Sequence, residues 1–180
     1  MIRTVYFDMD GVLTDLFSVI LDAFECNDAE ELLNGYTPQQ LNNFLLSEVE
    51  YGNLFTRLPR ANGFYRVIAL IDDCIKERYR VSILSSLGGL GINGDGGLTV
   101  IKQKKTWLIQ NLGVHRYNHM LAPKFVYECH EKASFANPQS LLIDDRSKNC
   151  DGFMRAGGHA YHYGHDRSES SIKALRGLLF

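Results

Sequence analysis

Apolar residues along the chain fall into short β-rich runs and longer stretches with helical spacing. Ile2–Phe7 is a short run rich in β-branched and aromatic residues, and it stops at two acids and a glycine. Ser140–Ile143 has the same character and ends at a second pair of acids. Runs of this length that end in turn residues predict buried strands. Arg80–Leu84 and Ala160–Tyr163 complete the predicted strands, with Tyr117–Leu121 as a further candidate.

Stretches with apolar residues at helical spacing separate these runs and predict helices. They are Leu16–Leu33, Pro38–Val49, Phe64–Glu77, Thr99–Leu112 and Asn149–Ala156. The first two follow one another directly and end before Pro59, which indicates a small helical insertion after the first strand. Strands that otherwise alternate with helices imply an α/β fold with a parallel sheet, in which sites form beyond the carboxyl ends of the strands.

The segment Gly88–Gly97 is rich in glycine and predicts a loop. Within it, Gly89–Gly94 matches the G-x-G-x-x-G pattern of dinucleotide-binding sites. Those sites also need an acid about 20 residues further on, and no Asp or Glu occurs between Leu98 and Tyr127. We therefore interpret the segment as a flexible loop and not as a nucleotide site.

The same acid-free stretch carries a group of basic residues. They are Lys102, Lys104, Lys105, Arg116 and Lys124. We interpret them as a solvated helix face, the alternative being a rim that attracts phosphorylated substrates.

Composition narrows the class of protein. The 180 residues are 45% hydrophobic and 22% charged, which is typical of one globular domain with a sizeable core. The net charge of -2 argues against bulk binding of nucleic acid. The four cysteines (Cys26, Cys74, Cys129 and Cys150) lie far apart without a C-x-x-C pair, so we expect reduced core thiols. No apolar run reaches membrane-spanning length, and we expect a cytosolic protein without membrane contacts.

The candidate chemistry lies in the acids that follow two predicted strands. Asp8 and Asp10 follow the first strand, and Asp144 and Asp145 follow a much later one. In a parallel sheet both strand ends can meet at one edge, which would gather four carboxylates in a small volume. Burying unpaired charges is unfavourable, and a hard divalent cation such as Mg²⁺ removes that penalty. The alternative, that these acids are helix caps and turn formers, explains one such acid more easily than two clusters.

Taken together, the motifs resemble those of the haloacid dehalogenase (HAD) superfamily. Asp-x-Asp-Gly-Val follows the first strand at Asp8, and Leu-Ile-Asp-Asp ends at Asp145. Between them, a middle strand ends in Ser85 and Ser86, and Lys132 precedes the last acidic motif. The resemblance spans nearly the whole chain. It implies a Rossmann-like parallel sheet flanked by helices, with a HAD-like core at 1–15 and 60–180 and a small helical cap at 16–59.

The resemblance also implies a phosphatase with defined residue roles. Asp8 would attack phosphorus and form an aspartyl-phosphate, and Asp10 would protonate the leaving oxygen and then activate water. Mg²⁺ would lie between Asp8, the backbone carbonyl of Asp10 and Asp144, with Asp145 close by or acting through water. Such groups are what phosphomonoester hydrolysis needs, because the site must position an attacker and neutralise charge on the phosphoryl group.

Three polar residues complete the candidate phosphate site. Ser85 and Ser86 would donate hydrogen bonds to phosphoryl oxygens, although Ser85 taken by itself favours the interpretation as a helix cap. Lys132 would supply positive charge to the phosphate and to Asp8, with Lys124 as its rival. Asn149 either positions the loop after Asp145 or caps its helix.

Substrate choice is expected to lie in the insertion, which is rich in aromatic residues. These are Phe17, Phe24, Tyr36, Phe44, Tyr51 and Phe55. Most should form the core of the insertion, and one or two could stack on a base. The opening Phe7–Asp15 and the ending Leu141–Asp145 are similar to the 5'(3')-deoxyribonucleotidase branch, which implies a deoxynucleoside monophosphate as substrate. Departures from that branch include Ser85 in place of its usual Thr and the unfamiliar glycine loop.

Two alternatives stay open at this point. One is a HAD phosphatase for another small metabolite or for the 3'-phosphate of a nucleic acid. The other is a catalytically silent relative that binds phosphorylated ligands or a protein partner. The presence of both Asp8 and Asp10 argues against the silent relative, since losing either would be the simplest sign of lost turnover.

Overall fold

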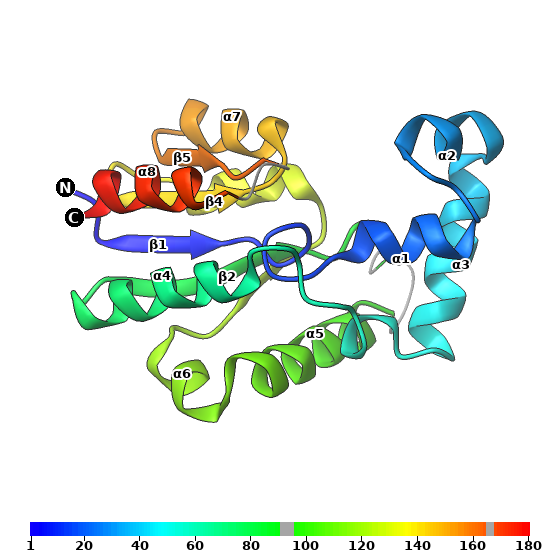
Figure 1. Ribbon diagram of the computed structural model, residues 1–180, viewed down its shortest axis with the longest axis horizontal. Coiled ribbons are helices and arrows are strands. Elements are labelled where there is room, and N and C mark those ends of the chain that lie inside the picture. The colour runs from blue at the N-terminus through cyan, green and yellow to red at the C-terminus, as the bar shows by residue number, and fades with distance from the viewer. Residues whose placement is uncertain (91–95, 165–167) are drawn as a thin grey trace.

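A five-stranded parallel sheet forms the centre of the molecule (Figure 1). The computed structural model describes residues 1–90, 96–164 and 168–180. The strands are β1 (Thr4–Phe7), β2 (Arg80–Ser86), β3 (Lys124–Val126), β4 (Ser140–Asp144) and β5 (His159–His162), in the order β3-β2-β1-β4-β5. The predicted α/β fold with a parallel sheet is confirmed.

The register of the central strands brings their carboxyl ends to one level. Phe7 at the end of β1 pairs with Ile83 of β2 on one side and with Ile143 of β4 on the other. Asp8 therefore emerges beside Asp144, although the two residues are far apart in sequence.

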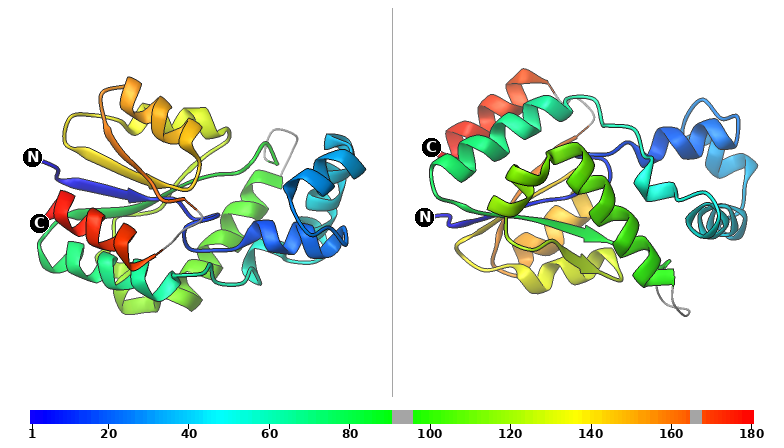
Figure 2. Two further views of the ribbon diagram at one scale, coloured as in Figure 1. Left: turned by 45° about the horizontal axis from the view of Figure 1, so that its top comes forward. Right: turned by 90° about the horizontal axis from the view of Figure 1, so that it is seen from below.

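Helices cover both faces of the sheet (Figure 2). One layer holds α4 (Phe64–Lys76), α5 (Gly96–Leu112) and α8 (Glu169–Leu179), and the other holds α7 (Ser147–Arg155) and the 3₁₀ helix η2 (Cys129–Phe135). The alternation of side chains along each strand explains this division. Val5 and Phe7 pack with the first layer, whereas Tyr6 packs with Phe153 and Phe135 of the second.

The insertion after β1 forms a helical cap beyond the carboxyl end of the sheet (Figure 1). It contains α1 (Leu16–Ala23), α2 (Ala29–Gly35), α3 (Pro38–Glu50) and the 3₁₀ helix η1 (Leu54–Thr56). Phe24 packs edge-on against Tyr36 and Phe44, with centroids 4.5 and 5.2 Å apart, so these aromatics form a small core of the cap. The chain leaves and re-enters at adjacent points, where the Asp15 amide donates to the Pro59 carbonyl over 2.9 Å.

The helix predicted over Leu16–Leu33 is two helices. Glu25 has a φ of +53°, which breaks the helix after α1. Asp28 then caps α2 by accepting from the Glu31 amide over 2.9 Å, and the Glu31 carboxylate accepts from the Asn27 amide. This reciprocal capping explains why a new helix begins there.

Other boundaries also differ from the predictions. The prediction of a strand at Tyr117–Leu121 is wrong, because Val114–His119 forms the short helix α6. The third strand is Lys124–Val126. Helix α5 begins at Gly96 and so takes the last two residues of the predicted glycine loop. Residues 91–95 of that loop lie outside the described residues. Helix α8 was not predicted. No helix among the described residues is long and apolar enough to span a bilayer.

Candidate active site

Carboxylates from two strands converge at the carboxyl end of the sheet, as the sequence predicted. Asp8 is 4% exposed and Asp144 is fully buried. Asp8, Asp144 and Asp145 each offer an oxygen, and these atoms all lie within 4.8 Å of one another. The backbone at Gly11 lies very close to the Asp145 side chain. A Cβ added at Gly11, whose φ is +87°, would lie 2.0 Å from Asp145 Oδ2. Gly11 therefore lets the loop after β1 meet the loop after β4.

The Asp8 carboxylate is held at both oxygens. Its Oδ1 accepts from the Met9 amide over 2.7 Å, and its Oδ2 lies 2.8 Å from Lys132 Nζ. Burial raises the pKa of Asp8 well above its ordinary value; Lys132 opposes this rise, whereas Asp144 and Asp10 add to it. An ionised Asp8 is therefore under electrostatic strain that another cation nearby would relieve.

Lys132, and not Lys124, reaches the carboxylates. Lys132 is 1% exposed and its Nζ lies 2.7 Å from Asp144 Oδ2 as well as near Asp8, whereas Lys124 is exposed at the start of β3. Burial lowers the pKa of Lys132, but the charges of Asp8 and Asp144 outweigh burial and the pKa is raised. The Lys132 side chain is therefore a fixed ammonium that bridges the tips of β1 and β4.

Asn149 has a role that neither sequence interpretation gave. Its Nδ2 donates to both oxygens of Asp144, over 3.0 and 3.1 Å. The Arg146 amide donates to Asp144 Oδ1 over 2.9 Å, and Arg146 occupies the capping position of α7. Asn149 thus fixes the orientation of the Asp144 carboxylate.

A second buried lysine, Lys104 of α5, enters the site from the other side. Its Nζ donates to Asp10 Oδ2 over 2.5 Å, to Ser85 Oγ over 2.9 Å and to the Ser86 carbonyl over 2.8 Å. Lys104 is fully buried, so the expectation that it belongs to a solvated helix face is wrong. Thr14 holds the other Asp10 oxygen, Oδ1, over 3.0 Å.

Ser85 and Ser86 lie at the end of β2, but they differ in surroundings. Ser85 is fully buried and its hydroxyl accepts from Lys104. Ser86 lines the cavity above the carboxylates, and its Oγ lies 3.2 Å from Cys129 Sγ. Ser86 is therefore the better placed of the two to meet a ligand in the cavity.

The donor set fits a hard divalent cation. Among the described residues, Asp8, Asp144 and Asp145 form the one group of three or more potential ligands with this spacing. Carboxylate oxygens are the ligands that Mg²⁺ prefers. Lys104 and Lys132 balance two of the four charges of Asp8, Asp10, Asp144 and Asp145, which leaves an excess that a divalent cation matches.

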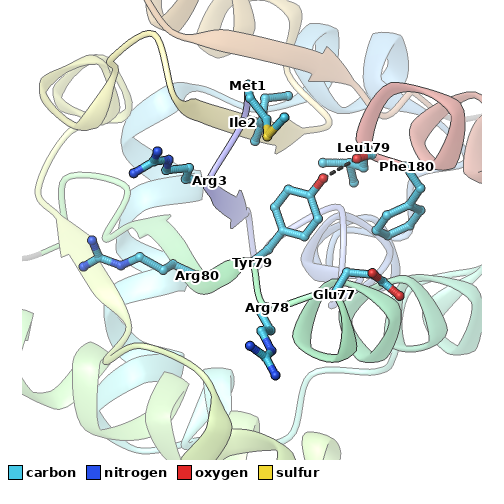
Figure 3. A pocket seen from close by; sticks show the side chains of 9 residues that line it. All are labelled: Met1, Ile2, Arg3, Glu77, Arg78, Tyr79, Arg80, Leu179 and Phe180. Carbon is cyan, nitrogen blue, oxygen red and sulfur yellow. Dashed lines mark hydrogen bonds between the residues drawn. The ribbon is translucent and has the colours of Figure 1, made fainter.

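A cavity of about 960 Å³ opens above these residues, between the strand ends and the cap. A smaller cavity of about 510 Å³ lies at the opposite, amino end of the sheet (Figure 3). It is lined by segments 1–3 and 77–80 and by Leu179 and Phe180, and the Tyr79 hydroxyl donates there to the Leu179 carbonyl. It shares no residue with the carboxylate cluster, so the larger cavity is the candidate active site.

Comparisons with known proteins bear on the fold. The sequence matches no protein-family model and no curated protein sequence. Among solved structures, the chain is similar to a dehalogenase, with 13% identity, a TM-score of 0.58 and coverage of 98% of this chain and 96% of the other. It is also similar to a protein from Porphyromonas gingivalis described as a predicted HAD-like family hydrolase, with 19% identity, a TM-score of 0.51 and coverage of 99% and 98%. This chain therefore has the HAD-like α/β fold.

Proposed function

We propose that this protein is a magnesium-dependent phosphomonoester hydrolase that acts through an aspartyl-phosphate on Asp8. The observation that carries the proposal is the placing of Asp8: a buried carboxylate at the floor of the cavity, 2.8 Å from Lys132 Nζ and within reach of the Asp144 and Asp145 oxygens. Such surroundings suit a nucleophile that must approach a phosphate dianion.

In the proposed reaction, an Asp8 oxygen attacks phosphorus and the bond to the leaving oxygen breaks. Asp10 delivers a proton to that oxygen, and after the alcohol departs it takes a proton from the water that hydrolyses the acyl phosphate. Lys104 and Thr14 hold the Asp10 carboxylate in place for both steps. Mg²⁺ held by Asp8, Asp144 and Asp145 would supply Lewis acidity and offset charge on the phosphoryl oxygens.

The structural neighbours include a dehalogenase. A halide ion leaves without a proton, whereas an alkoxide needs one. The anchored Asp10 is therefore more useful to an ester hydrolase than to a dehalogenase. Three clustered carboxylates that Lys132 offsets only in part would also repel a halocarboxylate substrate.

A deoxynucleoside monophosphate is the narrower proposal for the substrate. It is supported by the motif resemblance and by Phe17, which lines the cavity with a partly exposed ring that can face a base. The other proposals are another small phosphorylated metabolite and a nucleic-acid 3'-phosphate. A panel of dTMP, glucose 6-phosphate and a 3'-phosphorylated oligonucleotide separates the three.

The reaction class is tested with p-nitrophenyl phosphate. We expect hydrolysis that requires Mg²⁺, is lost in Asp8→Asn and is retained in Asp151→Asn, which alters an exposed acid on α7. Full turnover in Asp8→Asn would exclude the covalent route. Equal turnover after removal of divalent cations would exclude the metal site.

A further inference from the structure

Helix α1 is made largely of apolar residues, yet none of its eight residues is buried. An apolar helix face normally packs against another element. Leu16 and Val19 pack in part against the core, whereas Phe17, Ile20 and Leu21 line the cavity above the carboxylates, and Phe17 is 42% exposed. The apolar face of α1 is therefore directed at the space where a ligand of the candidate site would lie.

Further apolar residues border the cavity, beside polar ones such as Asn27 and Asn62. Leu45 and Phe55 contribute from the cap, and Leu87 and Leu90 contribute from the loop after β2. The cavity volume of about 960 Å³ is enough for a small-molecule ligand. A ligand whose phosphate lies at the floor would thus place the rest of its body beside the apolar face of α1.

The charged residues that line the cavity are predominantly acidic. They are Asp8, Asp10, Asp15, Asp28 and Asp145, with Arg146 as the basic residue. Asp15 and Asp28 lie on the cap side of the cavity, where they are the N-terminal capping residues of α1 and α2. Arg146 directly follows Asp145 on the core side, and its Nη1 lies 3.1 Å from Cys129 Sγ. A second anionic group on the substrate would therefore meet acids on the cap side, with no cation from the cap among the described lining residues.

We propose that the cavity selects phosphate monoesters whose leaving alcohol is uncharged and presents an apolar face, and that it rejects alcohols carrying a second anionic group. This proposal rests on the proposed phosphatase activity and names its substrate class. A nucleoside satisfies the charge condition and offers the flat face of its base; a phosphorylated carboxylic acid or a sugar bisphosphate does not satisfy the charge condition.

The test compares esters of primary alcohols, so that the reactivity of the leaving oxygen is similar. We expect kcat/KM for 2-phenylethyl phosphate to exceed that for glucose 6-phosphate by at least about tenfold, the discrimination that an apolar pocket provides. 3-Phosphoglycerate, which carries a carboxylate, should be slower still. Equal values for the three esters, or a preference for 3-phosphoglycerate, would overturn the proposal.

Substitutions on α1 locate the effect. Phe17→Asp places a charge in the cavity wall, whereas Ala23→Asp places the same charge on an exposed position of the same helix outside the cavity. Phe17→Asp should lower kcat/KM for 2-phenylethyl phosphate by at least about tenfold and leave that for acetyl phosphate, whose leaving group is small, nearly unchanged. Ala23→Asp should change neither. Ile20→Asp provides a second variant if Phe17→Asp has a much lower melting temperature than the wild-type protein.

Binding of phosphonates that are not hydrolysed tests the selectivity of the cavity independently of the proposed phosphatase activity. Calorimetry with benzylphosphonate and phosphonoacetate measures the same preference without turnover. Tighter binding of benzylphosphonate, weakened by Phe17→Asp, supports the cavity assignment even if no ester is hydrolysed, in which case only the phosphatase proposal fails. Binding of neither phosphonate, or tighter binding of phosphonoacetate, would overturn the cavity assignment.

Discussion

The floor of the cavity, at the strand ends, is formed by buried charged residues, whereas its roof, helix α1, is formed by partly exposed apolar residues. On the floor, Asp8, Asp144, Lys132 and Lys104 are almost completely buried, and each has charged or hydrogen-bonding partners at defined distances. On the roof, α1 offers apolar side chains that are only partly covered. The floor is suited to fix one reaction, and the roof to decide which molecules reach it.

This difference has energetic consequences. Removing one of the buried lysines leaves its carboxylate partners uncompensated, with a penalty of about 3–5 kcal/mol for a fully buried pair. Replacing a half-exposed apolar side chain leaves no such group behind. Substitutions on the floor should therefore affect catalysis for every substrate, whereas substitutions on the roof should affect some substrates and spare others.

After Asp8→Asn, which should abolish turnover, the largest effect on the floor of the cavity is expected from Asp10→Asn. We expect kcat to fall by at least about 100-fold, the scale of general acid-base catalysis. The loss of kcat/KM, which reports the step in which the leaving oxygen departs, should be greater for 2-phenylethyl phosphate than for p-nitrophenyl phosphate, because nitrophenolate needs less help from an acid. Asp22→Asn, on the exposed side of α1, is the control. An equal loss for both esters would mean that Asp10 does not protonate the leaving oxygen.

A smaller effect is expected from Lys104→Gln. This change removes the ammonium that holds Asp10 and Ser85, and we expect kcat to fall by about tenfold or more, as for the loss of a charge-assisted hydrogen bond. Lys105→Gln, on the exposed side of α5, should have little effect.

The affinity for Mg²⁺ shows whether Lys104→Gln acts through the charge of the site or through a general loss of folded structure. Loss of the Lys104 ammonium makes the net charge of the carboxylate cluster more negative, so Mg²⁺ should bind Lys104→Gln more tightly than the wild-type protein. Weaker Mg²⁺ binding, with kcat unchanged, would contradict the place given to Lys104.

The smallest expected effect is a change in thermal stability, produced by Asp8→Asn. The pKa of Asp8 is raised in the folded state, so the native protein gains stability as the pH falls through that pKa and loses it as the pH rises. With a chelator present at neutral pH, Asp8→Asn should therefore have a higher melting temperature than the wild-type protein, because the buried charge is gone.

The pH dependence provides the check on this stability prediction. The difference in melting temperature should shrink as the pH is lowered through the raised pKa of Asp8, and Asp151→Asn should show no comparable change. A destabilised Asp8→Asn at every pH would show that Lys132 more than compensates the buried charge.

The acids of the site could be predicted from sequence because strand ends carry a local signal. Asp8 and Asp144 each follow a short buried run, and the parallel sheet aligns the two ends. Lys132 could be placed only through the resemblance, since a lysine in the 3₁₀ helix η2 has no pattern that marks it as buried.

Lys104 was missed although the sequence contained a signal for it. It lies four residues after Val100 and three before Trp107, and both are buried on the inner face of α5. Helical periodicity therefore places Lys104 on the buried face. The run of neighbouring basic residues favoured a solvated face instead, and only the tertiary partners Asp10 and Ser85 explain its burial.

The third strand could not be predicted because it depends on contacts distant in sequence. Lys124–Val126 is only three residues long and pairs with the end of β2, from Leu84 to Ser86. So short a segment carries no clear alternation. In contrast, the break after α1 had a local signal in Asp28 and Glu31, which form the capping pair of α2.

The most direct measurement of the central claim is to trap the covalent intermediate. Asp10→Asn should form the aspartyl-phosphate faster than it hydrolyses it when given p-nitrophenyl phosphate and Mg²⁺. Acid quenching followed by peptide mass spectrometry should then find one phosphoryl group on Asp8, removed by alkaline hydroxylamine as expected for an acyl phosphate. Turnover with no phosphoryl group on Asp8, or with the group on another residue, would contradict the mechanism.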